Sequence, residues 1–206
     1  MPHFDLALLG FGNVGQALAQ LLLRKQNDLK SQYDISFAVT AIGTGRHGAA
    51  IDPDGINLKQ AITMMNSNAL LDTLSTLPVP TDGLSLIKNC GADVLFENTP
   101  VNYESGQPAL DHLRTALGLG MHAITANKGP VVHGYNDLST LAAAKDRKFF
   151  FESTVMDGAP IFSLFRETLP TAHLVGFRGI LNSTTNLILS RMETGEDLDE
   201  AVAYAQ

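Results

Sequence analysis

Short apolar runs alternate with longer amphipathic stretches along most of this chain. The runs have strand length, whereas the stretches between them carry apolar residues at helical spacing. Because strands that alternate with helices build parallel βαβ units, this rhythm predicts an α/β fold with a doubly wound parallel sheet. The expected strands are residues 4–9, 35–42, 92–96, 121–125 and 149–151, and the expected helices are residues 14–30, 58–65, 69–74, 110–119 and 135–145.

The rhythm changes after residue 151, which predicts a first domain over residues 1–150 and the first part of a second, α+β domain over residues 151–206. Pro160 stands where a helix is expected to begin, at the position that proline favours. Residues 173–181 are predicted to form a strand, and Ser183 or Thr184 to cap the helix that follows. Residues 198–206 have a helical pattern without a stop signal, so we expect the chain to be cut in mid-helix.

A glycine-rich turn joins the first expected strand to the first expected helix. In a G-x-G-x-x-G string, the first glycine allows the tight turn, the second lets the backbone approach a pyrophosphate, and the third lets helix and strand pack closely. The free N–H groups of the helix then face the phosphates. The alternative is a glycine-rich turn in an ordinary α/β domain. We therefore predict a Rossmann-type dinucleotide-binding fold with cofactor contacts at Gly10, Phe11, Gly12, Asn13, Val14 and Gly15.

Composition narrows the class of protein. Hydrophobic residues make up 45% and charged residues 17% of the 206 residues, which predicts a folded core. The net charge of −7, without a basic cluster, argues against a nucleic-acid partner. The apolar runs are too short to span a membrane, and the first residues do not resemble a signal peptide. We therefore expect a cytoplasmic protein.

Three polar loops follow expected strands: residues 10–15, 97–100 and 126–128. Ligands of open α/β sheets bind beyond the carboxyl ends of the strands, so we expect these loops to converge on one site. Asn98 and Thr99 could offer hydrogen bonds to the nicotinamide end of a dinucleotide, and Lys128 a mobile cation. The alternatives are turn chemistry for Asn98 and Thr99 and a solvated surface position for Lys128.

The glycine-containing segment 43–57 is predicted to be a loop, and its start bears on which dinucleotide binds. A carboxylate after the second strand would accept the ribose hydroxyls of NAD, but Thr44 and Arg46 occupy this region instead. An arginine can form two parallel hydrogen bonds with the additional phosphate of NADP. We therefore expect Thr44 and Arg46 to contact NADP. A solvated Arg46 in a protein that accepts both cofactors remains the alternative.

Cys90 is the single cysteine, which excludes an internal disulfide and any CxxC motif. It precedes an expected strand, so we interpret it as a small buried hydrophobic residue.

The segments ESTVMDGAP (residues 152–160), LFRE (164–167) and GILNSTTN (179–186) add a more specific signal. Together with GFGNVG at residues 10–15 and TANKGPV at residues 125–131, they resemble homoserine dehydrogenase over essentially the whole chain.

This resemblance implies reversible hydride transfer between NAD(P)H and aspartate 4-semialdehyde, which gives homoserine for threonine and methionine synthesis. It also implies that Lys128 lies beside nicotinamide and substrate, and that the second domain serves substrate binding and dimerisation in a homodimer. A sodium-type ion, held mainly by backbone oxygens, would be bound at Glu152, Val155, Asp157 and Ala159.

The resemblance further implies that substrate-binding carboxylates and the principal catalytic lysine lie beyond residue 206. We therefore expect these residues by themselves to bind cofactor without turnover. A degenerate homologue is the alternative to a fragment. Two other classes also stay open: a dinucleotide-binding regulatory module without chemistry, and another amino-acid or semialdehyde dehydrogenase. A phosphorylating semialdehyde dehydrogenase would need a nucleophilic cysteine, and Cys90 is poorly placed for that role.

Overall fold

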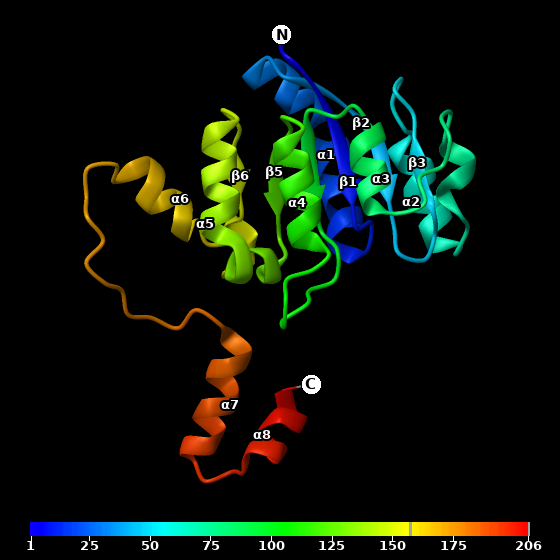
Figure 1. Ribbon diagram of the computed structural model, residues 1–206. Helices are drawn as coiled ribbons and strands as arrows, with labels where there is room; N and C mark the ends of the chain where they lie inside the picture. Colours follow the sequence, from blue (N-terminus) through cyan, green and yellow to red (C-terminus); the bar gives the residue numbers. More distant parts are fainter. Residues whose placement is uncertain (157, 206) are drawn as a thin grey trace. The chain divides into compact units, whose positions relative to one another are not determined.

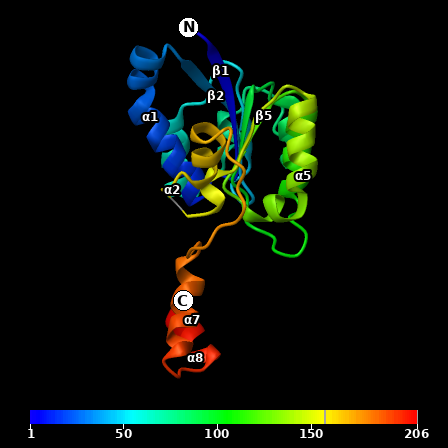
Figure 2. The same cartoon turned by 90° about the vertical axis from the view of Figure 1, so that its left-hand side faces the viewer.

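The computed structural model describes residues 1–156 and 158–205, which divide into two compact units, Met1–Phe151 and Glu152–Gln206. The first unit contains a six-stranded sheet with helices on both faces (Figures 1 and 2). Its strands are β1 (His3–Leu9), β2 (Ser36–Gly43), β3 (Ala49–Ile51), β4 (Val94–Glu97), β5 (His122–Thr125) and β6 (Phe149–Phe150). Its helices are α1 (Asn13–Tyr33), α2 (Leu58–Asn66), η1 (Leu71–Leu74), α3 (Gly83–Asn89), α4 (Ala109–Gly118) and α5 (Lys128–Ala144).

The strand order is β3-β2-β1-β4-β5-β6. All neighbouring pairs are parallel except β2 and β3. The chain leaves β1 toward β2 on one side and later returns to β4 on the other side of β1. The carboxyl ends of β1 and β4 therefore border the point where the strand order reverses, which is where ligands of such sheets bind. This arrangement confirms the predicted α/β fold with a doubly wound, mostly parallel sheet.

Strand β1 is buried on both faces, as a central parallel strand requires. Leu6 and Leu8 pack with residues of α1 and α2, whereas Ala7 and Leu9 pack with residues of α3 and α4. Figure 2 shows α1 and α2 on one face of the sheet and α5 on the other. Because alternate side chains of β1 enter different hydrophobic clusters, both helical layers fix the direction in which this strand presents its carboxyl end.

Several boundaries within the first unit differ from those expected. The segment 43–57 is not entirely a loop, since it contains the edge strand β3, which is too short to show a pattern and pairs with the end of β2. Residues 69–74 form only a 3-10 turn, Leu71–Leu74. Helix α3 was not predicted, although Asp82 and Ser85 form a capping box at its start. Helix α5 begins at Lys128 and not near residue 135, because Gly134 kinks it and interrupts the helical pattern.

Helix α1, with 21 residues, is long enough to cross a bilayer, but it carries Arg24, Lys25, Asp28 and Lys30. Across residues 1–156 and 158–205, no helix combines sufficient length with sufficient apolar character for a membrane span.

The second unit is mainly helical within its described residues. It contains η2 (Glu152–Thr154), α6 (Ile161–Ser163), the π turn η3 (Leu164–Thr168), α7 (Ser183–Glu193) and α8 (Leu198–Ala205). Pro160 is the residue before α6 and not its first residue. Asn182 caps α7 by accepting a hydrogen bond from Thr185 N, so the expectation that Ser183 or Thr184 caps this helix was wrong.

The strand predicted over residues 173–181 is not formed in the described second unit. This stretch has irregular backbone, and Val175 and Phe177 expose 100% and 74% of their surface. A strand needs a neighbouring strand for its backbone hydrogen bonds, and residues 152–156 and 158–205 provide none. The apolar sequence alone was therefore insufficient to determine the local structure.

Candidate functional site: a dinucleotide crevice at the carboxyl ends of β1, β4 and β5

The glycine turn after β1 packs closely against the loop after β4. Gly10 has φ +92°, and a Cβ at this position would lie 2.3 Å from the Asn98 carbonyl carbon. A Cβ at Gly15 would lie 2.4 Å from the Gly10 carbonyl oxygen. A Cβ at Gly12, by contrast, would meet nothing within 4 Å. Gly10 and Gly15 therefore serve the turn and its packing, whereas the space above Gly12 is open to a ligand.

The amino terminus of α1 borders the same open space. Gly12 is the residue before the helix, and no side chain caps the helix there. Asn13 and Val14 are exposed, but the Phe11 side chain is buried in the core at 1% exposure. Phe11 could therefore meet a cofactor only through its backbone. Uncapped N–H groups together with the helix dipole favour an anionic group at this position.

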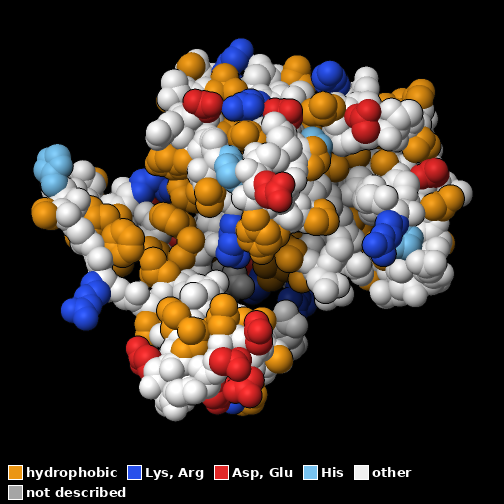
Figure 3. All heavy atoms as spheres, turned by 60° about the horizontal axis from the view of Figure 1, so that its bottom comes forward, with side chains coloured by type: hydrophobic (Ala, Val, Ile, Leu, Met, Phe, Trp, Pro, Cys, Tyr) orange, Lys and Arg blue, Asp and Glu red, His pale blue; other side chains and the backbone are white. Residues whose placement is uncertain are grey.

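The loops after β4 and β5 form a pocket beside the glycine turn. Its lining includes residues of all three loops that were expected to converge, with Val14 from residues 10–15. Figure 3 turns the carboxyl-terminal edge of the sheet toward the viewer and shows exposed hydrophobic side chains beside basic ones. Sequence reasoning missed Val101 and Tyr103, since nothing distinguished their loop from other connections. The lining residues are Val14, Asn98, Thr99, Val101, Tyr103, Ala126, Asn127 and Lys128.

A fully buried carboxylate lies beneath this pocket. Glu97, the last residue of β4, is 0% exposed. Its Oε1 accepts hydrogen bonds from the N–H of Thr99, at 3.0 Å, and from the Thr99 hydroxyl, while its Oε2 lies 3.0 Å from Thr125 Oγ1. The Thr99 hydroxyl therefore donates to Glu97 and not to a ligand. The sequence placed Glu97 in a polar loop without a role, although a carboxylate that ends a buried strand is itself unusual.

Asn127 connects the loop after β5 to the loop after β4. Its N–H donates to Thr125 Oγ1 at 3.0 Å, and its Nδ2 donates to the Thr99 carbonyl oxygen at 3.0 Å. Its Oδ1 accepts a hydrogen bond from Gly129 N and so caps helix α5. From the sequence, Asn127 was placed in the loop 126–128 without a role of its own. The structure shows that it holds both loops together.

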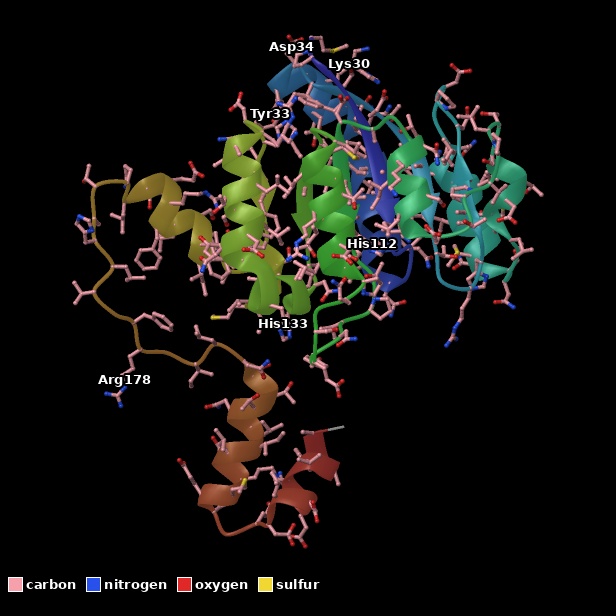
Figure 4. The ribbon with its side chains drawn as sticks, in the orientation of Figure 1. Lys30, Tyr33, Asp34, His112, His133 and Arg178 are labelled. Atoms are coloured by element: carbon pink, nitrogen blue, oxygen red, sulfur yellow. The ribbon has the colours of Figure 1, made fainter. Side chains whose placement is uncertain are left out.

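Lys128 is exposed and is the first residue of α5, directly after this cap. It lines the pocket with Asn98, whose buried Nδ2 has no hydrogen-bond partner among the described residues. Five residues further along α5, His133 Nε2 lies 2.8 Å from the carbonyl oxygen of Tyr103, which also lines the pocket; Figure 4 labels His133. An exposed cation and a residue with an unsatisfied buried amide donor therefore line the same pocket.

Arg46 lies in the loop between β2 and β3 and is exposed. The Thr44 hydroxyl donates to the Gly48 carbonyl oxygen at 2.9 Å and accepts from His47 N at 2.7 Å, so it stabilises the loop from within. The end of β2 is joined to the glycine turn, because Gly10 N donates to the Gly43 carbonyl oxygen at 2.9 Å. Arg46 therefore extends from a loop next to the glycine turn.

The segment expected to bind sodium belongs to the second unit. Both carboxylate oxygens of Glu152 accept backbone hydrogen bonds at 2.9 Å, from Phe162 N and Ser163 N. The Glu152 side chain therefore serves the start of α6. Asp157 lies outside the described residues. Across residues 1–156 and 158–205, no group of three or more His, Cys, Asp or Glu side chains could hold a metal.

Cys90 directly follows α3 and is buried, and it precedes β4 instead of following it, unlike the loop that lines the pocket. Burial raises the pKa of its thiol, so little reactive thiolate is present near neutral pH.

We expect iodoacetamide to modify Cys90 at least about 10-fold more slowly in the native protein than in the urea-unfolded protein, since the thiolate is the nucleophile. Mass spectrometry of timed samples measures this ratio. Equal rates in both states would contradict the assignment of Cys90 to the core.

The strand order and the open glycine turn at the amino terminus of α1 define a Rossmann-type dinucleotide-binding domain. Residues 10–152 match the family model described as homoserine dehydrogenase, NAD binding domain, and residues 160–206 match the model described as homoserine dehydrogenase. The chain therefore belongs to the homoserine dehydrogenase family, and the resemblance inferred from its motifs is confirmed.

Individual relatives support this membership. A homoserine dehydrogenase of Methanocaldococcus jannaschii is 37% identical over 98% of this chain and 60% of its own length. The NAD(+)-dependent homoserine dehydrogenase of Pseudomonas canavaninivorans is 34% identical over 100% of this chain and 58% of its own length. The structure of a hyperthermophilic archaeal homoserine dehydrogenase in complex with NADPH has a TM-score of 0.76 at 28% identity, over 99% of this chain and 60% of that one. The chain thus spans about 60% of the length of these relatives.

Proposed function

We propose that this chain supplies the dinucleotide-binding part of an NAD(P)-dependent homoserine dehydrogenase, which interconverts aspartate 4-semialdehyde and homoserine. The observation that carries the proposal is the crevice itself. The open space above Gly12 adjoins a pocket that Val14, Asn98 and Lys128 line together. A dinucleotide whose pyrophosphate lies at the start of α1 could extend its nicotinamide into that pocket.

The bound dinucleotide supplies the hydride in this chemistry. The N–H groups at the start of α1 would bind its pyrophosphate, and Asn98 Nδ2 would satisfy its missing hydrogen bond on the nicotinamide end or the substrate. Lys128 would bring positive charge to the aldehyde oxygen as negative charge develops there. Asn127 would keep Lys128 at the pocket by capping the helix on which it stands.

The proposal extends to the cofactor preference, for which Arg46 is the relevant residue. Two of the relatives differ in the dinucleotide that their names give. It is NAD(+) for the enzyme of Pseudomonas canavaninivorans and NADPH for the hyperthermophilic archaeal enzyme. In this chain Arg46 is exposed beside the glycine turn, and we propose that it contacts the additional phosphate of NADP, with Thr44 shaping its loop.

Arg46→Ala is therefore expected to reduce the preference for NADPH over NADH by about 1 to 3 kcal/mol, since a charge-assisted hydrogen bond to the phosphate is lost. Titration calorimetry with both dinucleotides measures this preference. Arg24→Ala is a matched control, because Arg24 lies in α1, away from the β2–β3 loop. Equal affinities for NADPH and NADH in the parent protein would contradict the assignment of Arg46.

Further parts of the proposal concern the whole enzyme. Backbone oxygens of Glu152, Val155, Asp157 and Ala159 would bind a sodium-type ion, in keeping with the preference of hard cations for oxygen ligands. The enzyme would act as a homodimer in the cytoplasm, in threonine and methionine synthesis. Both oxygens of the Glu152 carboxylate already accept hydrogen bonds from backbone N–H groups, which is consistent with a site made of backbone oxygens.

The test compares the present 206 residues with a protein continued to the length of the relatives. We expect both to bind NADPH, and only the longer protein to oxidise NADPH when aspartate 4-semialdehyde is added. Titration calorimetry and absorbance at the nicotinamide band measure the two properties. Binding by both proteins without turnover by the longer one would support a regulatory dinucleotide-binding module instead. Failure of both to bind any nicotinamide dinucleotide would overturn the proposal.

A further inference from the structure

The buried carboxylate of Glu97 connects both loops that form the pocket. Oε1 binds the loop after β4 through the backbone N–H and hydroxyl of Thr99. Oε2 lies 3.0 Å from Thr125 Oγ1 at the end of β5, and this hydroxyl also lies 3.0 Å from the Glu97 carbonyl oxygen. Thr125 Oγ1 in turn accepts the N–H of Asn127, in the loop after β5, at 3.0 Å. These hydrogen bonds form a closed network, because Asn127 Nδ2 donates to the carbonyl oxygen of Thr99. The Glu97 side chain therefore acts together with Asn127 to fix the position of the two loops relative to each other.

Glu97 lies in an environment that restricts the movement of its side chain. Glu97 pairs with Leu9 of β1 and with Thr125 of β5, so its backbone belongs to the centre of the sheet. Its side chain is excluded from water, where a hydrogen bond is difficult to replace. The imidazole Nδ1 of His112, labelled on α4 in Figure 4, lies 3.8 Å from Oε1 and is the nearest group that could balance the charge.

We propose that Glu97 is a positioning residue for hydride transfer: by hydrogen bonding alone it holds Asn98 and Lys128 at the same pocket. This inference rests on the proposed dehydrogenase function, and it adds a residue that touches neither dinucleotide nor substrate. The role belongs to the acceptor oxygens of Glu97 and not to its charge, because both oxygens are used by hydroxyl and amide donors. Two groups on different loops are then kept in register with the reacting atoms.

The strand residue Thr125 offers the sharpest test, because the sheet contains a matched control. Thr125 and Thr40 are both buried in parallel strands, at 2% and 1% exposure. The Thr125 hydroxyl serves Glu97 and Asn127, whereas Thr40 Oγ1 has no hydrogen-bond partner within the described residues. Thr125→Val and Thr40→Val therefore remove the same group from similar surroundings, but only the first breaks the connection between the loops.

In the longer protein, Thr125→Val is expected to lower kcat roughly 10- to 100-fold while the KM for NADPH stays within about twofold, since the Lys128 loop is released and the glycine turn is not. Thr40→Val should leave both constants unchanged. Glu97→Gln should retain most of the kcat, because its amide oxygen can still accept from Thr99 and its NH2 group can donate to Thr125 Oγ1. Loss of kcat in Glu97→Gln equal to that in Thr125→Val would overturn the hydrogen-bonding role.

Hydrogen exchange tests the inference independently of turnover. In the present 206 residues, Thr125→Val should speed exchange of the amides of residues 126–130 by at least about 10-fold, and Thr40→Val should not, because of the two threonines only Thr125 is hydrogen-bonded to that loop. If the exchange rates change as expected but the longer parent protein never reduces aspartate 4-semialdehyde, the proposed function fails and Glu97 remains the residue that joins the loops. Unchanged exchange in Thr125→Val would overturn the inference even in an active enzyme.

Discussion

Replacing Gly12 with valine is expected to abolish dinucleotide binding while leaving the protein folded. The added side chain meets no protein atom near its Cβ, and the backbone there has φ −81° and ψ −151°, an extended conformation open to any residue. The branched side chain would instead fill the space that a pyrophosphate needs above the start of α1. We expect the dissociation constant for NADPH to rise at least about 100-fold, which corresponds to about 3 kcal/mol of binding free energy.

Circular dichroism and dinucleotide titration measure the two outcomes of this substitution separately. Gly118→Val is a matched control, since Gly118 in α4 also has open space around its Cβ but lies outside the crevice. Gly15→Ala should behave differently and destabilise the fold, because its Cβ would lie 2.4 Å from the Gly10 carbonyl oxygen. Full NADPH affinity in Gly12→Val would mean that the glycine turn serves packing alone.

Removing the Lys128 side chain is expected to lower turnover of the longer protein about 100-fold or more, with NADPH binding changed far less. Lys128 is exposed at the pocket and is the first residue of α5, held there by the Asn127 cap. A positioned cation stabilises the alkoxide that develops when hydride reaches the aldehyde, and removal of one such group typically costs this factor. Steady-state kinetics with aspartate 4-semialdehyde and NADPH measure kcat and both KM values.

Lys145→Ala provides the control for Lys128→Ala, because Lys145 is also exposed and caps the opposite end of the same helix. It should keep the kcat of the parent. If Lys128→Ala turned over as fast as the parent, its role in chemistry would be wrong. Similar losses in both variants would point to a general effect of charge or stability.

Part of the site was predictable from the sequence, because the spacing of the glycines indicates the role of each one. Gly10, Gly12 and Gly15 follow an apolar strand at fixed spacing, and the structure gives each the geometry that this spacing predicts. The cofactor contacts themselves stay predictions. The part played by Glu97 was not predictable, since its partners come from separate segments, Thr99 from the loop after β4 and Thr125 from the end of β5. Only the pairing of β4 with β5 brings these residues together.

The apolar rhythm by itself determined the α/β class, the parallel strands of the first unit and the place of the glycine turn, because these depend on local periodicity and steric demands that the residues carry with them. Tertiary structure decided the rest. The edge strand β3 exists because the end of β2 offers it hydrogen bonds, while residues 173–181, equally apolar, form no strand without such a partner in the described second unit. Likewise, Lys128 and Asn98 meet at one pocket because adjacent parallel strands end at the same edge of the sheet, a relation between segments distant in sequence.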